Sequence, residues 1–274
     1  MAFARFTSLF TRTKGAVIGM VHVKPLPGTP LSQHVMKDIV EIACQEAEIY
    51  KNSGVDGILI ENMFDLPYLQ ASSLGPETVA CMTRVCQEVR DITPSHIPCG
   101  VQILAGGNKE AVAVSKACGL QFIRAECFVF SHVADEGLMN ASAGSLLRYR
   151  RSVGAEDILI FTDIKKKHSA HAITSDVDIV EMAQAAQFFL ADGVIITGSS
   201  TGQEADNTEL EAVCRHIDLP ILIGSGITKD NVHKYVGANA FIVGSHFKKN
   251  GKWYEDLEKD RVEAFINALN KSRE

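Results

Sequence analysis

One short stretch of the sequence places a carboxylate and two amines two residues apart. It reads Phe161-Thr162-Asp163-Ile164-Lys165-Lys166-Lys167. Side chains two apart on an extended strand point to the same face, so we predict that Asp163, Lys165 and Lys167 share one face. A carboxylate beside an ammonium can move protons to and from a substrate, and a desolvated lysine can form a Schiff base. A structural ion pair between Asp163 and a lysine is the alternative interpretation.

Further titratable side chains stand at the ends of other apolar runs. Glu61, Glu126 and His168 are candidates for catalytic chemistry, and so is His22, for which a buried structural histidine is the alternative. These carboxylates could instead hold a divalent metal together with His22 or His168. Arg124, Lys165 and Lys167 are also available to pair with them, so a divalent metal is the less favoured alternative, and the metal and cofactor are left unknown. Three more polar residues near strand ends are predicted to line a substrate pocket: Asn62, Gln102 and Arg124.

Glycine-rich turns end the last two apolar runs of the chain. Gly224-Ser225-Gly226-Ile227 and Gly244-Ser245 let backbone N–H groups approach an anion closely, although glycines that only make tight turns are the alternative. We predict a phosphate site here, formed mainly by backbone N–H groups. An earlier run ends in Thr197-Gly198-Ser199-Ser200-Thr201, which adds Gly198 and Thr201 as candidate phosphate ligands.

The elements that must position these residues follow from the hydrophobic pattern. Eight short runs rich in Val and Ile are apolar on both faces, as the strands of a covered parallel sheet are. The predicted strands are Ala16–His22, Val55–Asn62, Gly100–Leu104, Gln121–Glu126, Asp157–Asp163, Asp192–Gly198, Ile221–Gly224 and Ala240–Ser245. The predicted helices are Asp38–Lys51, Pro76–Arg90, Asn108–Cys118, Asn140–Arg151, Asp176–Leu190, Asn207–His216, Asn231–Tyr235 and Asp260–Asn270.

This alternation predicts a single α/β domain, a (β/α)8 TIM barrel over residues 16–274. An open doubly wound sheet is the weaker alternative, because no G-x-G-x-x-G motif follows the first strand. In such barrels the active site lies at the carboxyl ends of the strands, where the polar candidates above concentrate. We therefore predict a small-molecule site on that face.

Composition excludes several classes of protein. With 274 residues, 46% of them hydrophobic and 22% charged, the chain falls in the ordinary globular range. The net charge of -6 argues against a nucleic-acid binder, and no apolar run is long enough for a membrane helix. Seven scattered cysteines without C-x-x-C spacing indicate reduced thiols, so a cytoplasmic location is predicted. A homo-oligomer is left open.

Residues 1–15 form a short N-terminal segment with two interpretations. The first 37 positions hold no acidic residue, and Phe3, Phe6 and Phe10 recur at roughly helical spacing among Ser, Thr and Arg. That composition is typical of a mitochondrial presequence, which would place the protein in the mitochondrial matrix. A short amphipathic helix that plugs the bottom of the barrel is the alternative. We favour the plug, because the first strand already begins at Ala16.

The chain also resembles the BtpA/SgcQ family from about residue 15 to about residue 270. The opening carries the resemblance most specifically, with Ile18-Gly19-Met20-Val21-His22 followed by Pro25-Leu26-Pro27-Gly28-Thr29-Pro30. The further matches are Gly54-Val55-Asp56-Gly57, Glu61-Asn62, Phe122-Ile123-Arg124, Lys167-His168-Ser169, Gly198 with Thr201-Gly202, Gly224-Ser225-Gly226 and Val243-Gly244-Ser245.

This resemblance implies a TIM barrel of the phosphate-binding type. One branch of the family is named for photosystem I biogenesis and another for a sugar-metabolism operon. Since the match includes Lys167-His168, it favours Lys167 over Lys165 as the reactive amine. The sequence departs from the family pattern at Gln102 and over Ala105-Gly106-Gly107-Asn108, which puts the role of the third strand in doubt.

Two functions remain open at this stage. The first is an enzyme acting on a small phosphorylated metabolite, a sugar or nucleoside phosphate, by isomerisation, epimerisation, retro-aldol cleavage or glycosyl-bond chemistry. The second is a non-catalytic assembly or stability factor for a protein complex, which should expose an apolar patch of more than a few hundred Å². We favour the enzyme, because an assembly factor does not need charged groups at the ends of so many strands.

Overall fold

The computed structural model describes residues 2–198 and 203–273, and in it eight parallel strands close into a barrel. The strands follow one another around the barrel in the order β1, β2, β3, β4, β7, β9, β10, β11. Their bounds are Ala16–His22, Gly57–Glu61, Cys99–Gln102, Phe122–Ala125, Leu159–Ile164, Gly193–Ile196, Ile221–Ile223 and Ala240–Val243. The predicted fold class is confirmed, and the open doubly wound sheet was wrong.

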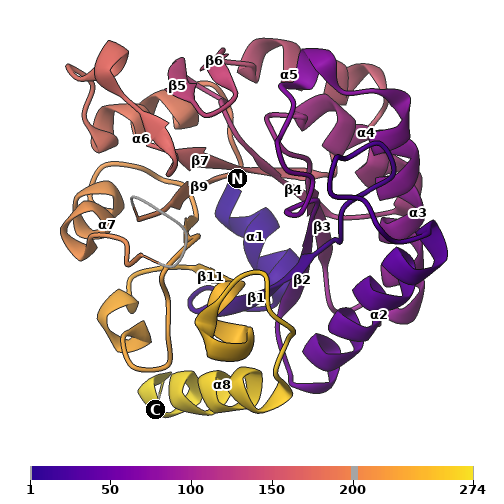
Figure 1. Ribbon diagram of the computed structural model, residues 1–274. Coiled ribbons are helices and arrows are strands. Elements are labelled where there is room, and N and C mark those ends of the chain that lie inside the picture. The colour runs from indigo at the N-terminus through magenta and orange to yellow at the C-terminus, as the bar shows by residue number, and fades with distance from the viewer. Residues whose placement is uncertain (1, 199–202, 274) are drawn as a thin grey trace.

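Helices surround the barrel as an outer ring (Figure 1). The helices that follow the barrel strands are α2 (Met36–Asn52), α3 (Pro76–Ile92), α4 (Asn108–Cys118), α5 (Ala143–Ser152), α6 (Ile179–Phe188), α7 (Asn207–Cys214) and α8 (Lys259–Arg273). The predicted helix Asn231–Tyr235 was wrong in type: it is a 3₁₀-helix, η3 (Val232–Tyr235).

Alternation along each strand divides the core into an inner and an outer part. Ile18, Met20 and Leu59 belong to a cluster inside the barrel, whereas Val17, Val21 and Ile58 pack outward against the helices. Because β1 and β2 are in register, with His22 opposite Glu61, the next inward positions above this apolar cluster are polar. The pleat of the sheet thus raises the polar side chains to the barrel mouth.

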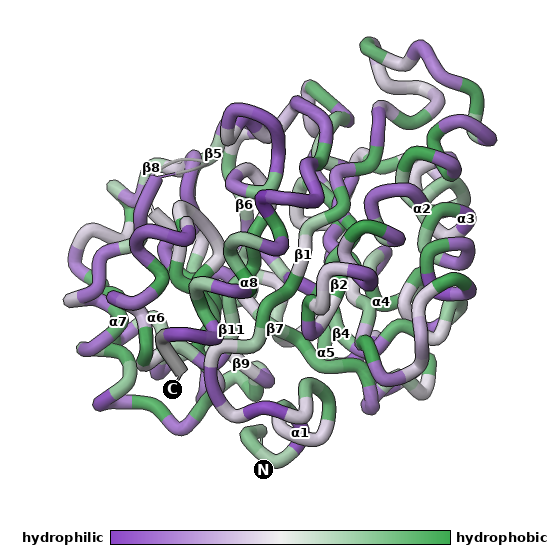
Figure 2. The backbone as a smooth tube through the Cα atoms, turned by 90° about the horizontal axis from the view of Figure 1, so that it is seen from below, coloured by the Kyte–Doolittle hydropathy of each residue, from purple (hydrophilic) through white to green (hydrophobic). Residues whose placement is uncertain are grey.

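The first helix, α1 (Ala2–Phe10), packs under the barrel. Phe6 and Phe10 are 0% and 1% exposed, and their ring centroids lie 6.1 Å from Phe161 and 5.7 Å from Phe122. Arg5 forms an ion pair with Asp192, at the start of β9. Figure 2 shows α1 at the end of the molecule opposite β5, β6 and β8. These contacts seat α1 at the amino ends of the strands.

A small antiparallel sheet that we did not predict covers part of the other end. Its strands are β5 (His132–Ala134), β6 (Gly137–Met139) and β8 (Ser169–Ala170), in the order β6-β5-β8. The three strands are only two or three residues long, so hydrophobic periodicity could not reveal them. We call this element the cap sheet. It brings the segment after β4 next to the segment after β7.

Within the described part of the chain, no helix has the length and apolar character required to cross a membrane. The seven cysteines all lie in the described ranges, and each is a free thiol. These two observations agree with the composition of the sequence.

Candidate active site

A cavity of about 530 Å³ opens at the carboxyl ends of the strands. Twelve of the predicted site residues line it: His22, Glu61, Gln102, Arg124, Glu126, Lys167, His168, Gly224, Ser225, Gly226, Gly244 and Ser245. Its floor includes Met20 and Ile242, from the apolar interior of the barrel. The cavity is within the size range of small-molecule sites and combines apolar walls with a few convergent polar groups.

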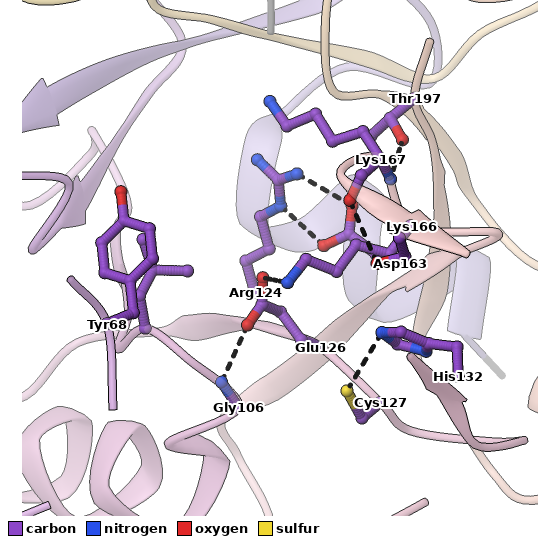
Figure 3. Close-up of polar contacts among 12 residues, drawn as sticks. Tyr68, Gly106, Arg124, Glu126, Cys127, His132, Asp163, Lys166, Lys167 and Thr197 are labelled. Carbon is purple, nitrogen blue, oxygen red and sulfur yellow. Dashed lines mark hydrogen bonds and ion pairs between the residues drawn. The ribbon is translucent and has the colours of Figure 1, made fainter. Parts of the chain in front are cut away.

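Asp163 is engaged by an arginine. Arg124 donates from Nε and Nη2 to the two carboxylate oxygens of Asp163, at 2.9 and 2.8 Å (Figure 3). The two side chains are 5% and 1% exposed, so the pair is buried in the wall of the barrel. A structural ion pair of Asp163 with a lysine was one predicted alternative, and Arg124 was among the cations available to it; the fork of a guanidinium matches a carboxylate better. Asp163 therefore holds Arg124 in place.

Glu126 has both carboxylate oxygens in use as well. It accepts from the backbone N–H of Gly106 at 2.8 Å, and Lys166 Nζ lies 2.9 Å from its other oxygen. Lys166 was not predicted as a site residue. It is the middle one of the three lysines, and strand alternation would place it on the opposite face from Lys165 and Lys167. The contacts of Glu126 join the segment after β3 to the segment after β7, so Glu126 connects neighbouring loops of the site.

The expected alternation fails at Lys165. Strand β7 ends at Ile164, and Lys165 has a φ of +46°, in the left-handed region, which turns the chain. Its backbone N–H lies 3.1 Å from the sulfur of Met182 on α6. Lys165 does not line the cavity in the described part of the chain, so the prediction that it faces the mouth with Lys167 was wrong.

Lys167 extends its amine into the cavity. In Figure 3 its side chain runs past Arg124, and its Nζ has no hydrogen-bond or ion-pair partner among the described residues. Burial, and next the positive charge of Arg124, lower the pKa of Lys167 to about 8, although Glu61 opposes the shift. A lysine of this kind is partly neutral near physiological pH, which is the state that a nucleophilic or proton-transferring amine needs.

Glu61 is the one predicted carboxylate of the described site that no cation pairs at salt-bridge distance. It is buried at the end of β2 and lines the cavity. Burial raises its pKa, in spite of the nearby positive charges of Arg124 and Lys167. A carboxyl group whose pKa is raised toward neutrality is suited to general acid–base work.

His22 is fixed in one tautomer. Its Nδ1 lies 3.0 Å from the backbone oxygen of Trp253, and a carbonyl oxygen can only accept, so Nδ1 carries the proton. Burial, with Lys248 nearby, lowers the pKa of His22 to about 3, and the ring is therefore neutral. Its bare Nε2 is left as an acceptor close to Gly244.

The two glycine turns leave backbone donors unused. Within the described residues, no protein acceptor lies at the N–H groups of Ser225, Gly226 and Ile227. Ser245 and His246 open the 3₁₀-helix η4 (Ser245–Phe247), whose first N–H groups have no acceptor inside the helix. All five residues line the cavity. The donors therefore converge from β10 and β11 on the same space.

Other predictions about these turns need correction. Gly198 donates its N–H to Ser225 Oγ at 2.7 Å, so this N–H is not available to a ligand. A Cβ on Gly226 would lie 2.0 Å from the backbone oxygen of Gln203, so this glycine permits a close backbone approach. Thr201 lies outside the described residues.

The predicted pocket residue Asn62 does not line the cavity, because its amide bonds with Leu104 and Asp65 instead.

The predicted metal alternative is not supported by the donor set. Among the described residues, no three His, Cys, Asp or Glu side chains come together as metal ligands would. Arg124 and Lys166 occupy oxygens of Asp163 and Glu126, so among the predicted ligands on the barrel strands and directly after them only Glu61 and the neutral His22 remain. Two donors do not make the oxygen-rich shell that a divalent cation prefers.

Several wall residues were missed by sequence reasoning. Trp253 lines the cavity and lies edge-on to His22. Tyr68 follows β2, and Asp135 with Glu136 forms the tip of the β5–β6 hairpin. These residues lie far from strand ends in the sequence, so the rule that located the other candidates could not find them.

Fold and site together define a (β/α)8 barrel with a charged cavity at the carboxyl ends of its strands. The chain belongs to the BtpA family, whose family model matches residues 13–271. It is 48% identical over 267 residues to a Caenorhabditis elegans protein named "Uncharacterized protein F13E9.13, mitochondrial", and the match covers 96% of each chain. It is 32% identical to the "Photosystem I biogenesis protein BtpA" of Synechocystis, over 94% of this chain and 89% of that one.

Among solved structures the fold is similar to thiamine phosphate pyrophosphorylase from Pyrococcus furiosus. The TM-score is 0.60 at 12% sequence identity, and the match covers 96% of this chain and 98% of that one. A likeness at this identity establishes the barrel fold and no more. The chemistry of the site has to be argued from this chain's own residues.

Proposed function

We propose that this protein is an enzyme acting on a small phosphorylated carbonyl compound. The observation that carries the proposal is the joint placement, in one cavity, of unused backbone N–H groups and an unpaired amine. The N–H groups of Ser225–Ile227 and of Ser245 and His246 suit the phosphate, because fixed dipoles bind an anion with little reorganisation. Lys167 stands in the same space, available to the rest of the substrate.

The charges around Lys167 support proton transfer next to a carbonyl. Lys167 and Arg124 can stabilise negative charge that develops on the substrate oxygen. Glu61, unpaired and buried, can take and return the proton. Such a division of labour serves isomerases and lyases, two of the reaction classes left open by the sequence.

The names of two similar proteins bear on this proposal, one on the substrate class and the other on the location, and neither identifies a substrate. Thiamine phosphate pyrophosphorylase, whose barrel resembles this one, is named for a phosphate ester. The mitochondrial name of the Caenorhabditis elegans relative bears on location. For this chain we propose a reducing compartment, either the cytoplasm or the mitochondrial matrix, since its seven cysteines are free thiols.

The second candidate is a non-catalytic assembly factor, and one observation favours it. Phe188, Phe189 and Leu190 at the end of α6 are 82%, 46% and 68% exposed. Three adjacent exposed apolar side chains suit contact with another protein. An assembly role would not, however, account for the unpaired Lys167 and Glu61 in the cavity, because burial of charge is costly.

A binding experiment with matched variants tests the enzyme proposal. Thermal shift is measured with methyl phosphate and a panel of phosphorylated metabolites, each paired with its unphosphorylated form. We expect stabilisation by phosphorylated compounds alone, roughly 2.7 kcal/mol at 100 times the dissociation constant. Ser245→Asp, which adds a negative charge at the turn, should lose the stabilisation. Ser245→Asn, which has the shape of the aspartate variant without its charge, should keep it. Equal responses to both forms of each compound, or an unaffected Ser245→Asp, would reject the phosphate site.

A further inference from the structure

Three cavity residues stand side by side on neighbouring strands. His22, Glu61 and Gln102 are the last residues of β1, β2 and β3. The strand pairing places His22 opposite Glu61, and Glu61 opposite Gln102. Residues in register on parallel strands point to the same side, about 4.8 Å apart from strand to strand. All three side chains line the cavity, so they form one row across its wall.

Each member of the row offers a hydrogen-bond acceptor that the protein leaves unused. Gln102 is 2% exposed, and its Oε1 has no partner within the described residues. His22 presents the bare Nε2, because Trp253 holds its Nδ1 proton. The carboxylate of Glu61 has no cation at salt-bridge distance among those residues. A buried acceptor without a partner, as Gln102 Oε1 is, is costly and uncommon, which indicates that a ligand satisfies it.

The rest of the cavity wall has the complementary character, with β4 and β11 on either side of the row and β7 and β10 further round the barrel. Arg124 and Lys167 provide cationic donors, and the turns after β10 and β11 provide backbone N–H groups. A ligand that contacts both the row and these donors must therefore carry an anionic group and several hydrogen-bond donors. A cationic donor such as an alkylamine does not fit, because two of the three acceptors are neutral and Lys167 and Arg124 lie nearby. Hydroxyl groups fit all three.

We infer that the row of His22, Glu61 and Gln102 binds the hydroxyl groups of the substrate, which is a polyhydroxylated phosphate ester of the sugar-phosphate class. The inference rests on the phosphate-binding function proposed above and narrows it. Gln102 is then a specificity-determining residue.

The experiment compares esters with and without hydroxyl groups on the full-length protein. Dissociation constants are measured by calorimetry for methyl phosphate, ribose 5-phosphate, fructose 6-phosphate and glucose 6-phosphate. We expect at least one sugar phosphate to bind 10-fold or more tightly than methyl phosphate. Gln102→Met, which keeps the length of the side chain but removes its polar atoms, should reduce this advantage 10-fold or more. The affinity for methyl phosphate should change less than 2-fold.

Two controls separate a ligand-binding role from a structural one. Gln87→Met, on the outer helix α3, should leave all four constants unchanged. The ligand-free Gln102→Met protein should melt no lower than the wild type, because the substitution removes an unsatisfied buried acceptor. A lower melting temperature together with an unchanged preference for sugar phosphates would show that Gln102 serves the fold.

The outcomes also separate this inference from the function on which it rests. If methyl phosphate binds but no sugar phosphate binds more tightly, the hydroxyl row is wrong and the phosphate site stands. If the sugar advantage exists but survives Gln102→Met, the row is equally wrong. If none of the four compounds binds, the proposed function fails, and the inference fails with it.

Discussion

At the scale of single residues, the site is a set of charges sorted into paired and unpaired groups. Asp163 and Glu126 are neutralised by Arg124 and Lys166, and these pairs shape the wall. The partner of Glu126 could not be deduced from sequence, because Lys166 reaches it only through the turn that the chain makes after β7. The positive φ of Lys165 breaks the alternation of the strand. As a result Lys166, and not Lys165, lines the cavity beside Lys167.

Lys167 gives a prediction about stability that distinguishes the reactive from the structural interpretation. The fold disfavours its charged form, so replacement by an uncharged side chain of similar length should stabilise the protein. We expect Lys167→Met to raise the free energy of unfolding at pH 7 by about 1–2 kcal/mol, which is less than the full pKa shift corresponds to, because the side chain is partly exposed. Turnover should fall about 100-fold or more. Urea unfolding and a turnover assay measure the two effects.

The pH dependence of this difference has a definite sign. The pKa of Lys167 is about 8 in the folded protein and near its ordinary 10.5 when unfolded. Between these values the unfolded chain binds more protons, so the stability of the wild type rises with pH. The advantage of Lys167→Met should thus be largest below pH 8 and shrink toward pH 10.5. A variant that is less stable than the wild type at pH 7 would mean that Lys167 stabilises the fold as an ion-pair partner.

At the scale of elements, the sequence located the barrel strands well and the loops poorly. Strand β1 was predicted with its correct ends, because Val and Ile runs buried on both faces are unmistakable in a parallel sheet. The cap sheet was missed, since strands of two or three residues are too short for a repeating pattern to be recognised. Trp253 was missed for a related reason: its place in the cavity depends on the long connection between β11 and α8.

Helix α1 offers the clearest prediction about an element. Phe6→Ala and Phe10→Ala should each reduce the free energy of unfolding by about 3–5 kcal/mol, because both rings are buried among the aromatic side chains of the barrel. Phe3 is 39% exposed on the same helix, and Phe3→Ala should cost less than about 1 kcal/mol. Urea unfolding of the three variants checks this. Similar, small losses for all three would show that the barrel does not need α1, as a removable leader requires.

At the scale of the whole molecule, the barrel collects groups distant in sequence at one end. The unused backbone N–H groups follow the last two strands, and the row of His22, Glu61 and Gln102 ends the first three. Lys167 follows β7, which lies between these strands in sequence. Strand-end position alone predicted this convergence, because parallel strands in a closed barrel bring their carboxyl ends together. The unused hydrogen-bonding capacity of each group could be recognised only from its surroundings in the folded chain.

The central claim is that unused backbone N–H groups at β10 and β11 hold a phosphate, and amide resonances report on it directly. The ¹⁵N-labelled protein is titrated with inorganic phosphate, with sodium chloride at equal ionic strength as the control. We predict saturable shifts of the amides of Ser225, Gly226, Ile227, Ser245 and His246, largest among all assigned residues. Shifts absent at these five amides, or centred on another part of the surface, would contradict the phosphate site and the function built on it.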